Sequence, residues 1–303
     1  MGSHNKRSNN ILVKSDYYMF GLHAVKAAIE NPNRRKHALW ISENARPKVF
    51  NNHKIPRIPI FNLDKSKSLP ISDNKVHQGA ILKVSPLKQP SDILEIQNAK
   101  QPKLVVILDK VSDPQNVGAI IRSSLFFNCT AIINTYNGGS GENGSLVKAA
   151  SGAFEQINYI QVTNISQTII KLKKLGYVVI ALDENSTNKI SSFNKGNDDI
   201  AIVFGAEGKG IRRLTKERCD LQLSIDGNHN FSSLNVSTAV GITLFNLQSN
   251  KSSNSQINGS NSFSIILTNS VSSKDLNNKR SKLSNSIIFF FICSISSLFR
   301  LQE

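Results

Sequence analysis

Cysteine, acidic side chains and long apolar runs are all scarce in this chain of 303 residues. The 3 cysteines are scattered, so no pair has the spacing of metal ligands and no disulfide framework is expected. This usage fits a reducing, cytoplasmic compartment. The N-terminus is polar and lacks the apolar core of a secretory signal, and the apolar run 287–299 is too short to span a bilayer. We therefore expect a cytoplasmic protein with no membrane segment and no metal site.

The shortage of acidic side chains leaves a large excess of positive charge. The chain has 37 lysines and arginines against 21 aspartates and glutamates, a net charge of +16 and a pI of about 9.8. So much positive charge favours a polyanionic partner, most often nucleic acid, although a basic protein need not bind one. The basic run 34–37 is compatible with a solvated loop and with an edge that contacts phosphates.

The N-terminal third of the chain divides into a leader, a small domain and a linker. Residues 1–15 are polar and are expected to be disordered. Residues 16–85 combine a short helical pattern with strand patterns at 38–41 and 79–84, which predicts a small α/β domain. Prolines and lysines then mark residues 86–102 as a linker.

Past the linker, the hydrophobic pattern changes. Residues 103–248 alternate continuous apolar runs with helical patterns, which predicts a mostly parallel sheet of buried strands. One helix, 165–175, is predicted to begin at a cap on Asn164 and to stop at Gly176. Residues 249–303 are a low-complexity tail rich in serine, asparagine and lysine. The expected strands are 104–108, 131–133, 177–182, 200–204 and 221–225.

A polar segment, residues 113–122, follows the first of these strands. It connects a strand to a helix, and open α/β sheets bind their ligands at that edge. Asn116 lies at the mouth of the helix, and Arg122 falls away from the apolar stripe of the helix. Arg122 is suited to clamp a phosphate or to orient a hydroxyl, although an ordinary Asp-Pro turn with a surface arginine would give the same pattern.

A second segment, residues 204–211, surrounds the carboxylate of Glu207 with three glycines. Glycine lets the backbone approach a ligand closely. The segment is not a phosphate loop, because no Gly-Lys-Ser/Thr ending is present. It also lacks the spacing of the dinucleotide fingerprint and follows a late strand. A glycine-rich turn without a ligand is the alternative.

A third segment, residues 231–245, begins with hydroxyl and amide side chains and continues almost wholly apolar. This pattern predicts a helix that is buried on most sides and carries Ser233, Asn235 and Ser237 in its first turn. The free backbone N–H groups of such a turn can bind a ligand. A capped core helix is the alternative.

Together and in this order, the three segments resemble the motifs of the SpoU (TrmH) family of RNA ribose 2′-O-methyltransferases, within the SPOUT class. Residues 21–25 and 77–79 are similar to the small RNA-binding domain of the branch that methylates a guanosine ribose in 23S ribosomal RNA. The resemblance covers residues 16–248. The family's motifs correspond here to residues 116–122, 204–211 and 233–237.

The resemblance implies an α/β fold: a C-terminal parallel-sheet SPOUT domain with a trefoil knot, preceded by a small L30e-like α/β RNA-binding domain. It implies a homodimer that binds S-adenosylmethionine in the knot and acts on 23S ribosomal RNA. Backbone around Gly205, Ile225 and Leu234 would bind this cofactor. The family usually has Pro-Met after the last strand, whereas this chain has Asp226-Gly227, which puts an acid beside the expected pocket.

The resemblance also implies a role for each catalytic residue. Arg122 would act as the base or would orient the ribose and its phosphate, although a free arginine stays protonated. Asn116 would position Arg122 or the RNA backbone, and Glu207 would polarise Arg122 or accept a proton itself. Ser233 and Asn235 would define the substrate side of the pocket.

Three other functions stay open at this point. A catalytically impaired RNA-binding protein is suggested by Asp226-Gly227 and by the composition of the tail. A transfer-RNA ribose 2′-O-methyltransferase would use the same three motifs on another substrate. A nucleotide-dependent oxidoreductase is weakened by the missing dinucleotide fingerprint.

Overall fold

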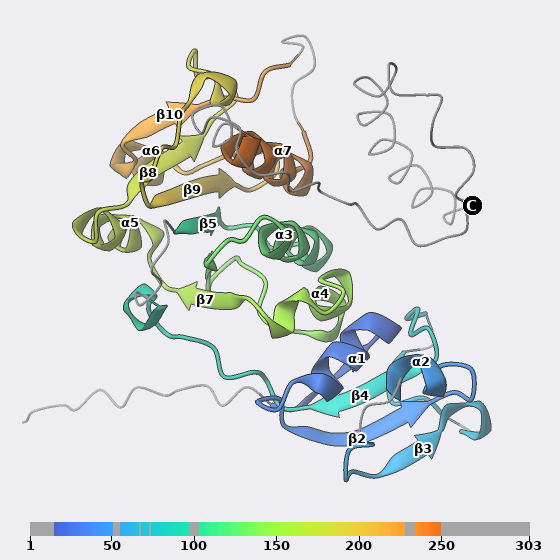
Figure 1. The fold of residues 1–303 in the computed structure, drawn as a ribbon. Coiled ribbons are helices and arrows are strands. Elements are labelled where there is room, and N and C mark those ends of the chain that lie inside the picture. Colours follow the sequence, from blue (N-terminus) through green and yellow to red (C-terminus); the bar gives the residue numbers. More distant parts are fainter. Residues whose placement is uncertain are drawn as a thin grey trace, which may run out of the picture. The chain divides into compact units, whose positions relative to one another are not determined.

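The structure is a computed structural model that describes residues 15–50, 55–66, 68–72, 74–96, 103–227 and 234–249 (Figure 1). Of the expected leader and tail, only Ser15 and Ser249 fall within these ranges. The domain boundaries drawn from composition stay predictions. No helix in the described part of the chain is long and apolar enough to cross a membrane.

The N-terminal region is built on a mixed sheet of four strands. Its elements are β1 (Tyr17–Phe20), α1 (Leu22–Glu30), β2 (Lys36–Ile41), α2 (Arg46–Phe50), β3 (Ile60–Asn62), η1 (Leu63–Lys65) and β4 (Ala80–Val84). The strand order is β1-β4-β2-β3, with β4 antiparallel to both of its neighbours and β3 parallel to β2. The small α/β domain and its two strand patterns are therefore confirmed, as β2 and β4.

The strand β1 was not predicted. Its four residues show no alternation, since the first pair is half-buried and the second pair is buried. The sequence therefore shows no pattern that separates this strand from the helix α1. The buried side chains of α1 have helical spacing: Ala24, Val25, Ala28 and Ile29. What makes these residues a strand is their antiparallel pairing with β4, more than 60 residues away in the sequence.

The second region is built on six parallel strands in the order β10-β8-β9-β5-β6-β7. Its strands are β5 (Leu104–Asp109), β6 (Ala131–Thr135), β7 (Asn158–Val162), β8 (Val178–Leu182), β9 (Ile200–Gly205) and β10 (Leu221–Leu223). Its helices are α3 (Pro114–Phe126), α4 (Gly144–Ala149), α5 (Ile165–Lys174), α6 (Arg213–Arg218) and α7 (Val236–Ser249), and its short 3-10 turns are η2 (Ile93–Ile96), η3 (Ala153–Glu155) and η4 (Ile190–Ser192). The predicted parallel sheet is confirmed.

Two apolar layers cover the two faces of this sheet. Val106 and Leu108 of β5 pack with α3, α4 and α7, whereas Val105 and Ile107 pack with α5. Every residue of β5 is buried, as the continuous apolar run predicted. The strand β7 was missed, because this edge strand mixes polar Asn158 and Gln161 with its apolar residues.

The predicted start and stop of α5 are confirmed. The Asn164 side chain accepts a hydrogen bond from the backbone N–H of Gln167 at 3.2 Å. The chain leaves the helix through Gly176, whose φ of +87° is a left-handed conformation that glycine adopts without strain.

The prediction for the last helix is wrong in two respects. α7 begins at Val236, so Asn235 precedes the first turn as a cap, and Ser233 lies outside the described residues. The helix is also not buried on most sides, since Phe245 is 59% exposed. Its buried side chains, which include Val240 and Leu244, form one face toward the sheet. The trefoil knot stays a prediction.

Candidate functional site

The three sequence motifs lie at one edge of the parallel sheet. The chain enters the first motif after β5 and the second after β9, and these strands are paired so that Asp109 lies opposite Gly205. The third motif follows β10 and leads into α7. Because parallel strands end at the same edge, loops far apart in the sequence meet there.

Three side chains, one from each motif, are joined by hydrogen bonds and form what we call the polar triad: Asn116, Glu207 and Asn235. The Nδ2 atom of Asn116 donates to Oε1 of Glu207 at 3.1 Å. The Nδ2 atom of Asn235 donates to the same Oε1 at 2.9 Å and to Oδ1 of Asn116 at 2.8 Å. Two amides therefore orient one carboxylate, and its second oxygen, Oε2, takes no part in these bonds.

Asn235 is held by its role as the cap of α7. Its Oδ1 accepts from the backbone N–H of Ser237 at 2.9 Å and of Thr238 at 3.4 Å, and from the Ser237 hydroxyl at 2.6 Å. The side-chain oxygen thus stabilises the helix while the nitrogen faces Glu207 and Asn116. The cap fixes which end of the amide points into the triad.

Glycines shape the loop that carries Glu207. The backbone N–H of Gly210 donates to the carbonyl of Ala206 at 2.8 Å, which closes the loop into a tight turn. A Cβ on Gly205 would lie 2.1 Å from the carbonyl carbon of Gly210, so no larger residue fits there. Gly208 has a φ of +74°, which also favours glycine. The turn places the carboxylate at its tip.

An ion pair between a buried carboxylate and the partly exposed Arg212, whose side chain is 45% exposed, was not predicted. Asp109, the last residue of β5, is 1% exposed, and its Oδ1 accepts from Nε of Arg212 at 2.7 Å. The backbone N–H of Arg212 donates to the other carboxylate oxygen at 3.2 Å. This pair anchors the second motif to the end of β5. The sequence carried a signal for it, since an acid directly follows a fully apolar strand.

The glycine of the first motif has a packing role. A Cβ on Gly118 would lie 2.4 Å from the Cβ of Ala149 and 2.6 Å from the carbonyl oxygen of Leu146. Both of those residues belong to α4, so Gly118 allows α3 and α4 to cross at close range. This contact fixes the helix that presents Asn116.

The structure does not bring Arg122 to the polar triad. Arg122 is six residues beyond Asn116 on α3, about 9 Å of helix rise and on another face. No hydrogen bond between Arg122 and a triad residue exists in the described part of the chain. Arg122 is exposed and lines a separate pocket of about 370 Å³ with Lys26 and Phe126. Within one chain, the predicted site residues therefore lie in two places: the polar triad and the pocket beside Arg122.

The three residues expected to bind a cofactor lie at the same sheet edge as the triad. Gly205 ends β9, Ile225 follows β10 and is half-buried, and Leu234 precedes Asn235 and is 47% exposed. Asp226, where this chain departs from the family motif, directly follows Ile225 and is exposed.

The cysteines of the described region are not suited to nucleophilic chemistry. Burial raises the pKa of the Cys129 thiol to about 12. Burial, followed by the neighbouring charge of Asp220, raises the pKa of Cys219 to about 12 as well. Both thiols stay protonated at neutral pH.

Comparison with known proteins agrees with this arrangement. Residues 103–245 match the SpoU rRNA Methylase family, and residues 18–90 match the domain described as RNA 2′-O ribose methyltransferase substrate binding. The chain is 33% identical over 237 residues to the 23S rRNA (guanosine-2′-O-)-methyltransferase RlmB of Coxiella burnetii, covering 76% of this chain and 94% of that protein. The RlmB of Escherichia coli K12 is 32% identical over 240 residues, covering 75% and 96%.

The fold has solved counterparts. The SpoU methyltransferase AviRb of Streptomyces viridochromogenes, crystallised with its cofactor AdoMet, aligns with a TM-score of 0.62 at 18% identity, over 76% of this chain and 88% of that one. A crystal structure described as an RNA 2′-O ribose methyltransferase aligns with a TM-score of 0.63 over 78% and 90%. At this level of identity the likeness supports the fold, and the sequence matches identify the relationship. The chain belongs to the SpoU family of RNA ribose 2′-O-methyltransferases.

Proposed function

We propose that this enzyme transfers a methyl group from S-adenosylmethionine to the 2′-hydroxyl of a guanosine ribose in 23S ribosomal RNA. The observation that carries the proposal is the polar triad, in which one side chain from each of the three family motifs meets at the carboxyl edge of the sheet. The choice of RNA rests on the relatives at 32–33% identity, which are named for this reaction.

The residues at the sheet edge fit S-adenosylmethionine. A Cβ on Gly208 or Gly210 would meet no atom within 4 Å, so open space lies over the backbone of this loop. Ile225 and Leu234 add apolar surface at the same edge. Gly205, Ile225 and Leu234 are the residues that we assign to cofactor binding. When bound, the cofactor supplies a methyl carbon made electrophilic by its sulfonium.

Glu207 is the side chain best placed to accept the proton of the ribose hydroxyl. The hydroxyl is a weak nucleophile until its proton is lost or shared. The amides of Asn116 and Asn235 hold one carboxylate oxygen, which leaves the orientation of Oε2 fixed for a donor from the substrate. A base held in this way contributes through position as well as through proton affinity.

We assign Arg122 to the ribose and its adjacent phosphate. Its exposed guanidinium is always charged and matches a phosphate in geometry. Asn116 then positions Glu207 and the RNA backbone, and Ser233 defines the substrate side, as the family motif implies. We also propose a homodimer in the cytoplasm, in which the net charge of +16 favours binding to RNA.

The proposal is tested by incubating the purified chain with labelled S-adenosylmethionine and transcribed 23S ribosomal RNA. Transfer RNA serves as the competing substrate. Digestion to nucleosides and mass spectrometry should detect 2′-O-methylguanosine in the ribosomal RNA alone. Methylation of transfer RNA alone would assign the chain to the other substrate class, and methylation of a base would contradict the proposed chemistry.

A second function is favoured by one observation. Asp226 is exposed and directly follows the half-buried Ile225, one of the residues that we assign to cofactor binding. A chain that binds RNA tightly but binds no S-adenosylmethionine would be an RNA-binding protein that has lost catalysis. The Asp226→Pro variant, which restores the residue usual in the family at this position, should regain cofactor binding if this acid is responsible.

A further inference from the structure

The pocket beside Arg122 lies between the two sheet regions. It has a volume of about 370 Å³, and its walls come from α1, α3 and the turn that follows α4. We infer that it binds one nucleotide of the RNA substrate, with the phosphate at Lys26 and Arg122 and the base against Phe126. This inference rests on the proposed function and gives that function a substrate-binding subsite outside the polar triad.

The charge of the pocket suits a phosphate. Lys26 and Arg122 enter it from helices of the two different regions, and the exposed ring of His23 adds a hydrogen-bonding group. The one acid among these residues, Glu30, lies 4.0 Å from the Lys26 ammonium in a partly exposed pair. Such a pair is weak, so a phosphate can replace the carboxylate as the partner of Lys26.

An aromatic side chain is available for a base. Phe126 ends α3 and is 77% exposed, the highest value among the large apolar side chains of the described region. Its ring and that of Phe127 form a T-shaped pair, with centroids 5.1 Å apart at 90°, so this neighbour covers at most one of its two faces. Unpaired RNA bases stack on exposed aromatic rings of this kind.

The back wall of the pocket is backbone. Ser151 has a φ of +52°, a left-handed conformation that is uncommon for residues other than glycine, and Gly152 follows with +91°. A Cβ on Gly152 would lie 2.9 Å from the Cβ of Ala27 in α1. The strained turn therefore lets α1 approach closely, which brings Lys26 to the same pocket as Arg122.

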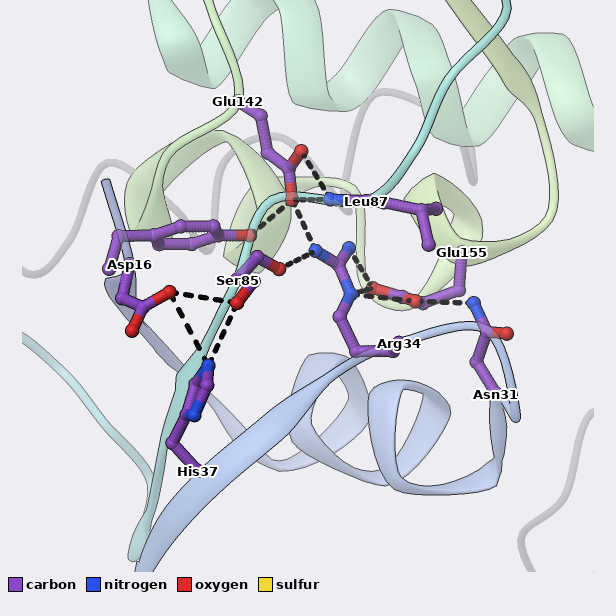
Figure 2. A network of polar contacts seen from close by, with 9 residues as sticks. Asp16, Asn31, Arg34, His37, Ser85, Leu87, Glu142 and Glu155 are labelled. Carbon is purple, nitrogen blue, oxygen red and sulfur yellow. Dashed lines mark hydrogen bonds and ion pairs between the residues drawn. The ribbon is translucent and has the colours of Figure 1, made fainter. Parts of the chain in front are cut away.

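A buried group of charges, the Arg34 network, holds this arrangement. Figure 2 shows Arg34 between Glu142 and Glu155, which both belong to the second region. Its Nη1 donates to Glu142 and its Nη2 to Glu155, each at 2.5 Å. All three side chains are at most 2% exposed. Burial disfavours the charge, but the bonds to Glu155 and the charge of Glu142 outweigh it and raise the pKa of Arg34.

Neighbouring groups complete the network. The Tyr17 hydroxyl donates to Glu142 at 2.7 Å, and the Asn31 amide, just past the end of α1, donates to Glu155 at 2.7 Å. Burial and then the charge of Glu142 raise the pKa of Tyr17, so it stays a donor. Because a buried charge needs all of its partners, the network fixes the end of α1 against the second region.

The test uses a short single-stranded RNA that carries one 2-aminopurine, whose fluorescence falls when the base stacks. Wild-type protein should quench the probe. Phe126→Leu should remove the quenching and raise the Kd about 5- to 100-fold, and Phe126→Trp should restore both.

Lys26→Gln should raise the Kd a few-fold and lower the slope of log affinity against log salt by about 0.7–1. With 23S ribosomal RNA, both losses should appear in KM and leave kcat within a few-fold.

The control is Lys174→Gln, which removes an exposed lysine from α5, and it should bind the probe like wild type. If Phe126→Leu and Lys26→Gln both behave like that control, the pocket binds no RNA and the inference is wrong. A change in oligomeric state at unchanged RNA affinity would show that a second copy covers Phe126, and it would overturn the inference too. The binding assay needs no methyl transfer. If the wild-type chain transfers no methyl group but these variants still lose RNA affinity, the proposed reaction is wrong and the inference about the pocket stands.

Discussion

The polar triad and the Arg34 network are both built from carboxylates held by nitrogen donors, but in opposite surroundings. Glu207 is exposed and accepts from two neutral amides, whereas Glu142 and Glu155 are buried and each meets a charged guanidinium. In the network, the acids are satisfied by residues of the chain itself. In the triad, one carboxylate oxygen is fixed and the other takes no part in the bonds between the three motifs.

This difference separates a structural use of charge from a chemical one. A buried charge is tolerated only when its partners are complete, so each member of the network is needed for the fold. An exposed carboxylate costs the fold little and can exchange its partners with a substrate. We therefore expect substitution of Glu207 to change transfer more than stability, and substitution of Arg34 to change stability more than transfer.

The largest effect is expected from Glu207→Gln, which removes the charge and keeps the shape of the side chain. Transfer should fall about 10²- to 10⁴-fold in kcat, because the ribose hydroxyl loses its proton acceptor. The free energy of unfolding should stay within about 0.5 kcal/mol. Single-turnover transfer and urea unfolding measure the two quantities. Glu217→Gln, at an exposed glutamate of α6, is the matched control and should leave both unchanged. Near wild-type turnover of Glu207→Gln would remove this residue from the mechanism.

Arg34→Met should break the network without touching the triad. It leaves two buried carboxylates without their cation, which costs about 3–5 kcal/mol of unfolding free energy. Arg35→Met, at the exposed neighbouring position, should change stability by about 0.5 kcal/mol or less. Urea unfolding of the two variants gives the comparison. Equal stability of both would mean that the network does not hold the fold.

Asn235 has both a structural role, as the cap of α7, and a role in the polar triad, and two substitutions can separate these roles. Asn235→Asp keeps an oxygen that caps α7 but replaces the amide donor with a second acid near Glu207. Asn235→Ala removes both functions. Both variants should lose transfer, and only the alanine should lose about 1 kcal/mol of stability. Thermal unfolding measures the loss of stability, and the transfer assay measures the loss of activity. Near wild-type transfer by Asn235→Asp would contradict the role of the amide donor.

The smallest effect concerns a pair at the end of β8. Burial opposes ionisation of Asp183, but the hydrogen bond from Lys216 outweighs it and lowers the pKa of this carboxyl below 3.8. A lowered pKa stabilises the fold above the unfolded-state value of about 3.9, and the contribution is lost as the pH falls through the folded-state value. Asp183→Asn should therefore cost about 1 kcal/mol or less at pH 7 and progressively less below pH 4. Stability curves of Asp183→Asn and Glu184→Gln against pH check this, and an equal pH dependence in both would disprove the role of the pair.

Local patterns in the sequence predicted most of the second sheet. Continuous apolar runs identified five of its strands, and a polar residue before an apolar stripe identified the cap at Asn164. The strands β1 and β7 were missed, because their assignment depends on pairing with distant strands more than on their own residues. The same limit applies to the start of α7, since several polar residues precede this helix and the sequence does not show that Asn235 is the one that caps it.

The site was predicted in its residues but not in its geometry. Asn116, Glu207 and Asn235 were chosen from separate motifs, and the structure joins them. Arg122 was expected to join them, but the rotation of α3 places it in the second pocket.

The basic run at 34–37 was predicted wrongly at Arg34, for a related reason. Arg34 is buried and paired with Glu142 and Glu155, so it is not solvated. The pairing could not be predicted locally, because both acids lie more than 100 residues away in the sequence. No pattern within the run distinguishes Arg34 from the exposed Arg35.

The central claim is that the motifs at the sheet edge form a working methyl-transfer site, and calorimetric titration of S-adenosylmethionine into the purified chain tests it most directly. We predict saturable binding with a micromolar Kd. No detectable binding by a folded sample that still binds RNA would contradict the claim, and Asp226 beside Ile225 would then be the first residue to replace.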